Sequence, residues 1–138
     1  MKTFKIITGL FLLILISCGQ TIYPDEILKR EIDFKLTIHN ENNYSSDSST
    51  VKIINKDSEK IAELKDWISN NSDGWESSIA SWATPDISLI GTDFRLLIFK
   101  DGVVIGFTDK NGNARQYTRR VNKTEFAFLI KYTMQEVK

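Results

Sequence analysis

The sequence predicts an α+β fold in which an antiparallel sheet of five to six strands carries two helices on one face. Three observations lead to this prediction. Several segments alternate apolar and polar residues, as half-buried strands do. The turn pairs Asp101-Gly102 and Asn111-Gly112 separate three of these segments. Two other segments, around 59–70 and 123–133, repeat apolar residues at helical spacing instead.

The first two strands are expected at residues 32–39 and 50–54. In the first of them apolar side chains alternate strictly with polar ones. Residues 40–49 are rich in asparagine and serine, so they form a loop between the two strands. We expect the strands to pair because this loop joins them.

A helix is expected to begin after Asp57 or Ser58, since either side chain can cap its first turn. It should end near Asn71, where Gly74 is available for a left-handed turn. Its apolar stripe consists of Ile61, Leu64, Trp67 and Ile68.

Residues 75–84 are interpreted as a further strand, which Pro85 ends or marks as a sheet edge. Seven residues separate Trp75 from Trp82, so on a strand these two rings point to opposite sides. They cannot then form one platform for a sugar ring, and we expect them to pack in the core. A loop between them would restore the sugar-binding alternative.

The strongest pattern is a three-strand meander in residues 94–121. With a type I′ turn at Asp101-Gly102 and a second two-residue turn, Gly106 is expected opposite Tyr117, whose ring fills the space above it. One face then forms the core with Leu96, Ile98, Val103, Ile105 and Phe107. The other mixes apolar and basic residues, namely Arg95, Leu97, Phe99, Val104, Arg115, Tyr117, Arg119 and Val121.

The last helix should follow Asn122, which has capping-box spacing to Glu125. Its buried stripe is expected to contain Phe126, Leu129, Ile130 and Thr133. Together with the helix near 59–70 it would cover the core face of the sheet.

The first residues have the layout of a secretion signal. Lys2 and Lys5 precede an apolar run at 6–16. As a helix this run would span about 16 Å, which is shorter than the ~30 Å hydrocarbon core of a bilayer. We therefore expect a signal sequence and not a transmembrane helix.

Leu15, Ile16, Ser17 and Cys18 end this run. They resemble the lipobox of bacterial lipoprotein precursors. The resemblance implies that residues 1–17 are a cleaved signal peptide and that Cys18 receives a diacylglycerol and fatty acyl chains such as palmitate. Residues 18–30 would then be a lipidated N-terminus and mobile tether, and residues 31–138 a single α+β domain. The alternative is an ordinary signal peptide beside an unrelated cysteine.

Lipidation at Cys18 would fix the protein to a membrane, because two or three acyl chains anchor a protein stably. Gly19 is not the aspartate that lipoprotein sorting associates with inner-membrane retention. The resemblance therefore implies the outer membrane in a Gram-negative cell. In a Gram-positive cell it implies the extracytoplasmic face of the single membrane.

The composition argues against several function classes. The expected mature chain carries a net charge of about −2, whereas nucleic-acid binding requires a strong positive field. The chain has one histidine and one cysteine, so we expect no metal site and no cofactor beyond the covalent lipid. No catalytic motif is present. The carboxylate pairs Asp66 with Glu76 and Asp86 with Asp93 are the remaining catalytic candidates.

We therefore expect a non-enzymatic, lipid-anchored envelope protein that binds a protein partner. The candidate contact residues lie on the mixed face, since arginine and aromatic residues are enriched in interfaces. They are Arg95, Phe99, Arg115, Tyr117 and Arg119. Three roles fit equally: an immunity protein, an accessory subunit or an inhibitor. The segment 64–75 resembles small bacterial lipoproteins, which implies no function. The alternative is an envelope sugar-binding module or hydrolase that uses Trp75 and Trp82.

Overall fold

The computed structural model describes residues 19–39, 49–79 and 83–134. The strands are β1 (Asp33–Ile38), β2 (Thr50–Asn55), β3 (Glu76–Ser77), β4 (Ile87–Ile90), β5 (Phe94–Phe99), β6 (Gly102–Thr108) and β7 (Ala114–Arg119). The helices are α1 (Pro24–Ile27), α2 (Glu59–Asn70), α3 (Ala127–Met134) and the 3-10 helix η2 (Lys123–Phe126).

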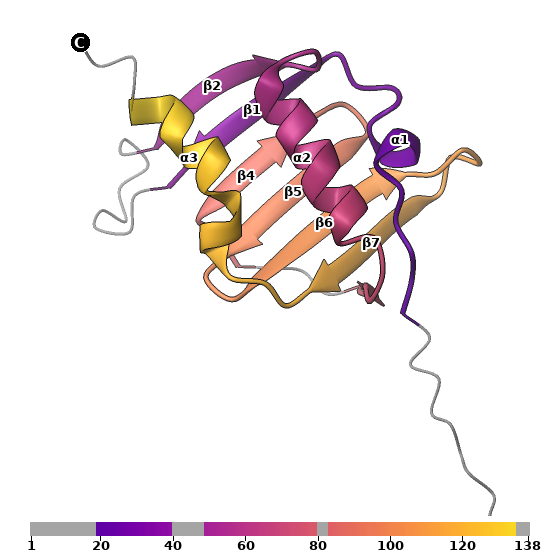
Figure 1. Ribbon diagram of the computed structural model, residues 1–138. Coiled ribbons are helices and arrows are strands. Elements are labelled where there is room, and N and C mark those ends of the chain that lie inside the picture. The colour runs from indigo at the N-terminus through magenta and orange to yellow at the C-terminus, as the bar shows by residue number, and fades with distance from the viewer. Residues whose placement is uncertain (1–18, 40–48, 80–82, 135–138) are drawn as a thin grey trace, which may run out of the picture.

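The strands form one antiparallel sheet in the order β2-β1-β4-β5-β6-β7-β3, and α2 and α3 lie on one face of it (Figure 1). The predicted α+β class is confirmed. The sheet has seven strands in the described part of the chain, which is more than the five to six expected. We call the two sides of the sheet the helix face and the solvent face.

The core fills the space between the helix face and the two long helices. Ser58 caps α2 by accepting the Ile61 N–H, and Gly74 has a φ of +79° just beyond the helix, as predicted. The strands that contribute buried side chains to this core are β1, β2, β4, β5 and β6, and the helices are α2, η2 and α3. Its most deeply buried members include Phe34, Leu36, Leu64, Leu89, Leu96, Ile105, Phe126 and Leu129.

Residues 19–31 belong to the domain, so the expected mobile tether over 18–30 is wrong for its described part. Ile22, Ile27 and Leu28 are buried in the core. Gln20 and Trp75 exchange two backbone hydrogen bonds of 2.7 and 3.3 Å. The sequence pattern was misleading because these apolar residues have no regular period and are anchored by contacts distant in the sequence.

Glu31 fixes the end of this segment to the turn between β4 and β5. Its side chain is buried, and its carboxylate accepts the N–H groups of Thr92 at 2.6 Å and Asp93 at 2.7 Å. Gly91 leaves room for this carboxylate, since a Cβ at that position would collide with it. A charged acceptor therefore replaces water for two backbone donors of the turn.

The strand expected over 75–84 is mostly absent from the described residues 75–79 and 83–84. Only Glu76 and Ser77 pair with β7, as strand β3, and residues 83–86 are not in a strand. Trp75 itself is fully buried, as expected for core packing. The expected strand position of Trp82 lies outside the described residues.

The first hairpin has the predicted strands but a different turn. Phe99 pairs with Gly102, so Lys100 and Asp101 form the two-residue connection. Positive φ occurs only at Gly74 and Gly112 among the described residues, which excludes the predicted type I′ turn at Asp101-Gly102. The pairing moves by two residues, so every side chain keeps its predicted face.

In the second hairpin the pairing register differs from the predicted one by one residue, so the side chains of β7 lie on the opposite face from the predicted one. Residues 109–113 form a longer connection than the expected two-residue turn, and Gly106 pairs with Gln116 instead of Tyr117. The helix face therefore receives three residues of β7 that were expected on the solvent face: Arg115, Tyr117 and Arg119. Val121, just after β7, was also expected on the solvent face and packs against the core instead. The space above Gly106 is occupied by the Arg95 side chain and not by a tyrosine ring.

Asp109 explains the longer connection. Its Oδ1 accepts the N–H groups of Asn111 and Asn113, both at 2.9 Å, and its Oδ2 accepts the Nε–H of Arg115 at 3.0 Å. The backbone hydrogen bond from Asn113, with further ones from Arg115 and Asn111, lowers the pKa of Asp109 from 3.8 to about 2. The carboxylate thus determines the loop length and, through it, the register of β7.

A pH titration tests this role of Asp109. Because its pKa is lowered on folding, its contribution to stability is present above about pH 4 and is lost as the pH falls toward 2. Carbon-detected NMR of the Asp109 carboxyl should give a midpoint near 2, and Arg115→Ala should raise it part of the way to 3.8. A midpoint at the ordinary value in the unmodified protein would contradict the assigned hydrogen bonds.

The last helix begins at the expected place with a different first turn. Asn122 accepts the Thr124 N–H at 2.9 Å and caps a 3-10 turn that leads into α3. Glu125 accepts the indole N–H of Trp67 at 3.0 Å. In the predicted capping box the Glu125 side chain would have accepted the Asn122 N–H. It accepts the Trp67 indole instead and so connects η2 to α2.

Candidate functional site

The residues predicted to form one binding surface are divided between the two faces. Arg95 and Phe99 lie on the solvent face, where they were expected. Arg115, Tyr117 and Arg119 lie on the helix face because of the register of β7. The predicted arginine and aromatic patch is therefore wrong as a single surface, and the reason is the loop held by Asp109.

On the helix face these three residues have structural contacts. Arg119 donates from Nη1 to the carbonyl oxygens of Asn71 and Asp73, just after the C-terminus of α2. Tyr117 packs beside Phe107, with ring centroids 5.9 Å apart, and Arg115 pairs with Asp109. A cation at the C-terminal end of a helix is favourable, so Arg119 stabilises the fold.

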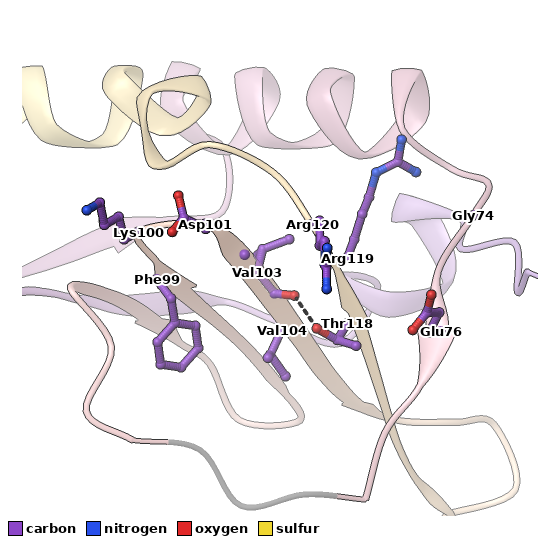
Figure 2. Close-up of a pocket in the computed structure, with 11 residues that line it drawn as sticks. Gly74, Glu76, Phe99, Lys100, Asp101, Val103, Val104, Thr118, Arg119 and Arg120 are labelled. Atoms are coloured by element: carbon purple, nitrogen blue, oxygen red, sulfur yellow. Dashed lines mark hydrogen bonds between the residues drawn. The ribbon is translucent and has the colours of Figure 1, made fainter.

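The β5–β7 half of the solvent face is largely covered. Val104 is fully buried although its side chain points away from the helices, and Ser88 on the neighbouring β4 is only 8% exposed. Figure 2 shows Phe99 and Val104 pointing to the same side of the sheet, away from the helices. Arg95 reaches across Gly106 to donate to Gln116. This half offers little apolar surface for a partner.

The other half of the solvent face exposes apolar side chains on neighbouring strands. Ile53 is 65% exposed, Val51 49% and Ile90 38%. Lys35 pairs with Ile53 on one side and with Ile90 on the other, so the three side chains form one row across β2, β1 and β4. We call these residues the outer patch: Lys35, Thr37, Val51, Ile53 and Ile90.

The outer patch reaches the edge of the sheet. β2 is the terminal strand and pairs only with β1 within the described segments. An edge strand can pair with a strand of another chain, and exposed apolar side chains beside it strengthen such contacts. The outer patch is therefore the surface best suited to a protein partner.

Sequence reasoning missed this patch although its signal was present. The segment Val51 to Ile54 places apolar residues on both faces of one strand. Ile54 is buried in the core, which leaves Val51 and Ile53 on the solvent side. When an edge strand has apolar residues on both faces, its second face is either covered by another part of the chain or available to a binding partner.

A hollow with a volume of about 810 Å³ lies where β6 begins and β7 ends (Figure 2). Its lining mixes charges of both signs, with Glu76 and Asp101 beside Lys100, Arg119 and Arg120. Thr118 donates its hydroxyl hydrogen to the Val103 carbonyl at 3.2 Å and so faces the sheet backbone.

The carboxylate pairs considered for catalysis are separated by the fold. Asp86 and Asp93 lie at opposite ends of β4, and they form ion pairs with Lys123 at 2.9 Å and Arg30 at 3.9 Å. Asp66 is exposed on α2, on the helix face, whereas Glu76 on β3 lies in the row of Thr118 on the solvent face. No group of three or more potential metal ligands occurs in the described segments.

The tryptophans do not form a sugar platform in the described segments. Trp75 is fully buried, and its indole N–H donates to the Asn71 carbonyl at 2.6 Å. Trp67 packs edge-to-face against Trp75, with ring centroids 6.3 Å apart, and contacts Phe126. Both rings are used for packing between α2, η2 and the N-terminal segment.

Comparisons with protein-family models, with curated proteins and with solved structures found no match to this chain. Within the described residues, no helix has the length and apolar character needed to cross a bilayer.

Proposed function

We propose that this chain is a non-enzymatic lipoprotein of the bacterial cell envelope that binds a protein partner through the outer patch. The observation that carries the binding proposal is the row of exposed apolar side chains, Ile53 and Ile90 with Lys35 between them, next to the edge strand β2. Burying such side chains on association is favourable, by about 25 cal/mol for each Å² removed from water.

The edge strand gives the proposed interface a definite geometry. A strand of the partner would pair with the backbone of β2 and place alternate side chains over Val51 and Ile53. The Lys35 ammonium group lies inside the patch and favours a carboxylate on the partner. In this binding mode the partner contacts both the backbone edge of β2 and the exposed side chains on the solvent face.

The anchor is proposed from the lipobox at Leu15, Ile16, Ser17 and Cys18. Acylation of Cys18 would hold the domain at a membrane surface, in the outer membrane of a Gram-negative cell or outside the single membrane of a Gram-positive one. An immunity protein, an accessory subunit and an inhibitor all need such placement and a protein-binding surface.

Substitution of Ile53 by glutamate tests the outer patch. Ile53→Glu should weaken capture of the partner from detergent-solubilised envelopes by tenfold or more, roughly the effect of losing a half-buried apolar contact and burying a charge. Because Ile53 is 65% exposed, its replacement should leave the unfolding midpoint nearly unchanged. Quantitative mass spectrometry of the captured proteins gives the readout.

Ile79→Glu is the matched control, since Ile79 is fully exposed and lies just after β3, at the other edge of the sheet. It makes the same change of side chain and charge and should keep the partner. Equal loss with both variants, or no loss with Ile53→Glu, would contradict the proposed interface. Binding of cell-wall glycan fragments that survives Ile53→Glu would favour the sugar-binding alternative.

A further inference from the structure

We propose that the lipid anchor holds this domain directly against the bilayer by its β3–β7 edge, so that the outer patch on β2 points away from the membrane. The proposal rests on the lipidation of Cys18 in the proposed function and adds an orientation to it. The part of the domain that contacts the lipid surface is the corner formed by Gly19 to Thr21 and Asp73 to Glu76.

The chain next to the anchor is fixed to the domain. The backbones of Gln20 and Trp75 form two hydrogen bonds, and Ile22 donates to the Ser72 carbonyl at 2.8 Å. Thr21 donates its hydroxyl hydrogen to Asp73 at 2.6 Å. A Cβ on Gly19 would lie 2.9 Å from the Gly74 Cα, so these two glycines pack backbone against backbone.

Very little chain remains between these contacts and the lipid. Cys18 is two residues from Gln20, and two extended residues span at most about 7 Å. The edge that carries β3 must therefore stay close to the headgroups. A flexible tether of the kind expected from the sequence would have allowed all orientations.

The binding surface lies at the opposite end of the sheet. Six strand intervals separate β3 from β2, which at about 4.8 Å each amounts to about 29 Å. Figure 1 shows the first described residues beside β7, with β2 at the far side of the sheet. The strand order thus places the anchor and the outer patch at opposite edges of the sheet.

The hollow beside the anchored corner carries charges of both signs, because Glu76 and Asp101 line it together with three cations. Lys100 and Arg120 are exposed on the wall of the hollow that Gly74 borders (Figure 2). Arg119 lines the same hollow. An anionic membrane attracts these cations but repels Asp73 and Glu76 at the corner, so the orientation rests on the short chain between Cys18 and Gln20 and not on charge.

Site-selective quenching tests the orientation in the full-length lipidated protein. Cys18 is the only cysteine, so Ser77→Cys or Thr50→Cys gives one free thiol for a fluorophore once Cys18 is acylated. Both positions are exposed, one on β3 and one on β2. The protein is reconstituted into phosphatidylethanolamine and phosphatidylglycerol vesicles with and without nitroxide-labelled headgroups.

We expect quenching at position 77 to exceed that at position 50 by roughly twofold or more, given their separation across the sheet. Insertion of about twelve Gly/Ser residues after Cys18, with an r.m.s. span of about 19 Å, should abolish the difference. Equal quenching at both positions in acylated protein would overturn the proposal. An unmodified thiol at Cys18 in the intact mass would instead refute the lipid anchor, and the orientation with it.

Discussion

Replacing Trp75 with alanine should lower the free energy of unfolding by about 3–5 kcal/mol, a large part of the stability of a domain this size. The ring is fully buried, packs against Trp67 and donates its N–H to the Asn71 carbonyl. Its backbone also holds Gln20. Urea unfolding of the chain starting at Gly19 measures the loss, and the Gln20 amide should exchange its hydrogen faster.

Trp75→Phe separates packing from hydrogen bonding in this prediction. It keeps an aromatic ring in the same position and removes the donor to Asn71, so it should cost less than the alanine variant. A small effect of Trp75→Ala, comparable with that of a surface substitution, would contradict the buried position. It would also return Trp75 to the list of possible ligand-binding residues.

The second large effect is expected at Glu31. Glu31→Ala should destabilise the protein by about 2–4 kcal/mol, because it leaves the N–H groups of Thr92 and Asp93 without their charged acceptor in a buried position. The same substitution frees the segment 19–30 from the turn between β4 and β5. Urea unfolding and hydrogen exchange at these two amides provide the measurement.

Glu26→Ala is the control for Glu31, since Glu26 is an exposed carboxylate on α1 and should change stability by less than about 0.5 kcal/mol. Gly91→Ala should reproduce part of the Glu31 effect, because its Cβ would displace the carboxylate. Equal stability of the Glu31 and Glu26 variants would show that the turn does not depend on this acceptor.

The elements of this fold follow from local patterns that the sequence contains. The alternation around Phe34 and the stripe of Ile61, Leu64 and Ile68 predict β1 and α2, and both are confirmed. The α+β class follows from them, since each apolar face needs a partner. The core face of the central hairpin is also confirmed, because a slip of two residues preserves the faces.

The candidate site could not be predicted, because it depends on one loop. Asp109 determines the length of the connection before β7, and a change of one residue moves Arg115, Tyr117 and Arg119 to the helix face. Side-chain hydrogen bonds to a loop backbone leave little trace in hydrophobic periodicity. Burial of the N-terminal segment through Ile22 and Glu31 was missed for a similar reason, since its contacts are distant in the sequence.

The mass of the mature chain, purified from membranes, tests the central claim most directly. A lipid-anchored envelope protein should yield an N-terminal peptide that begins at Cys18 and carries a diacylglycerol on its sulfur. The partner-binding role of the outer patch at the cell envelope and the orientation of the domain both depend on this modification. A free thiol at Cys18, or a chain that still begins at Met1, would contradict the account.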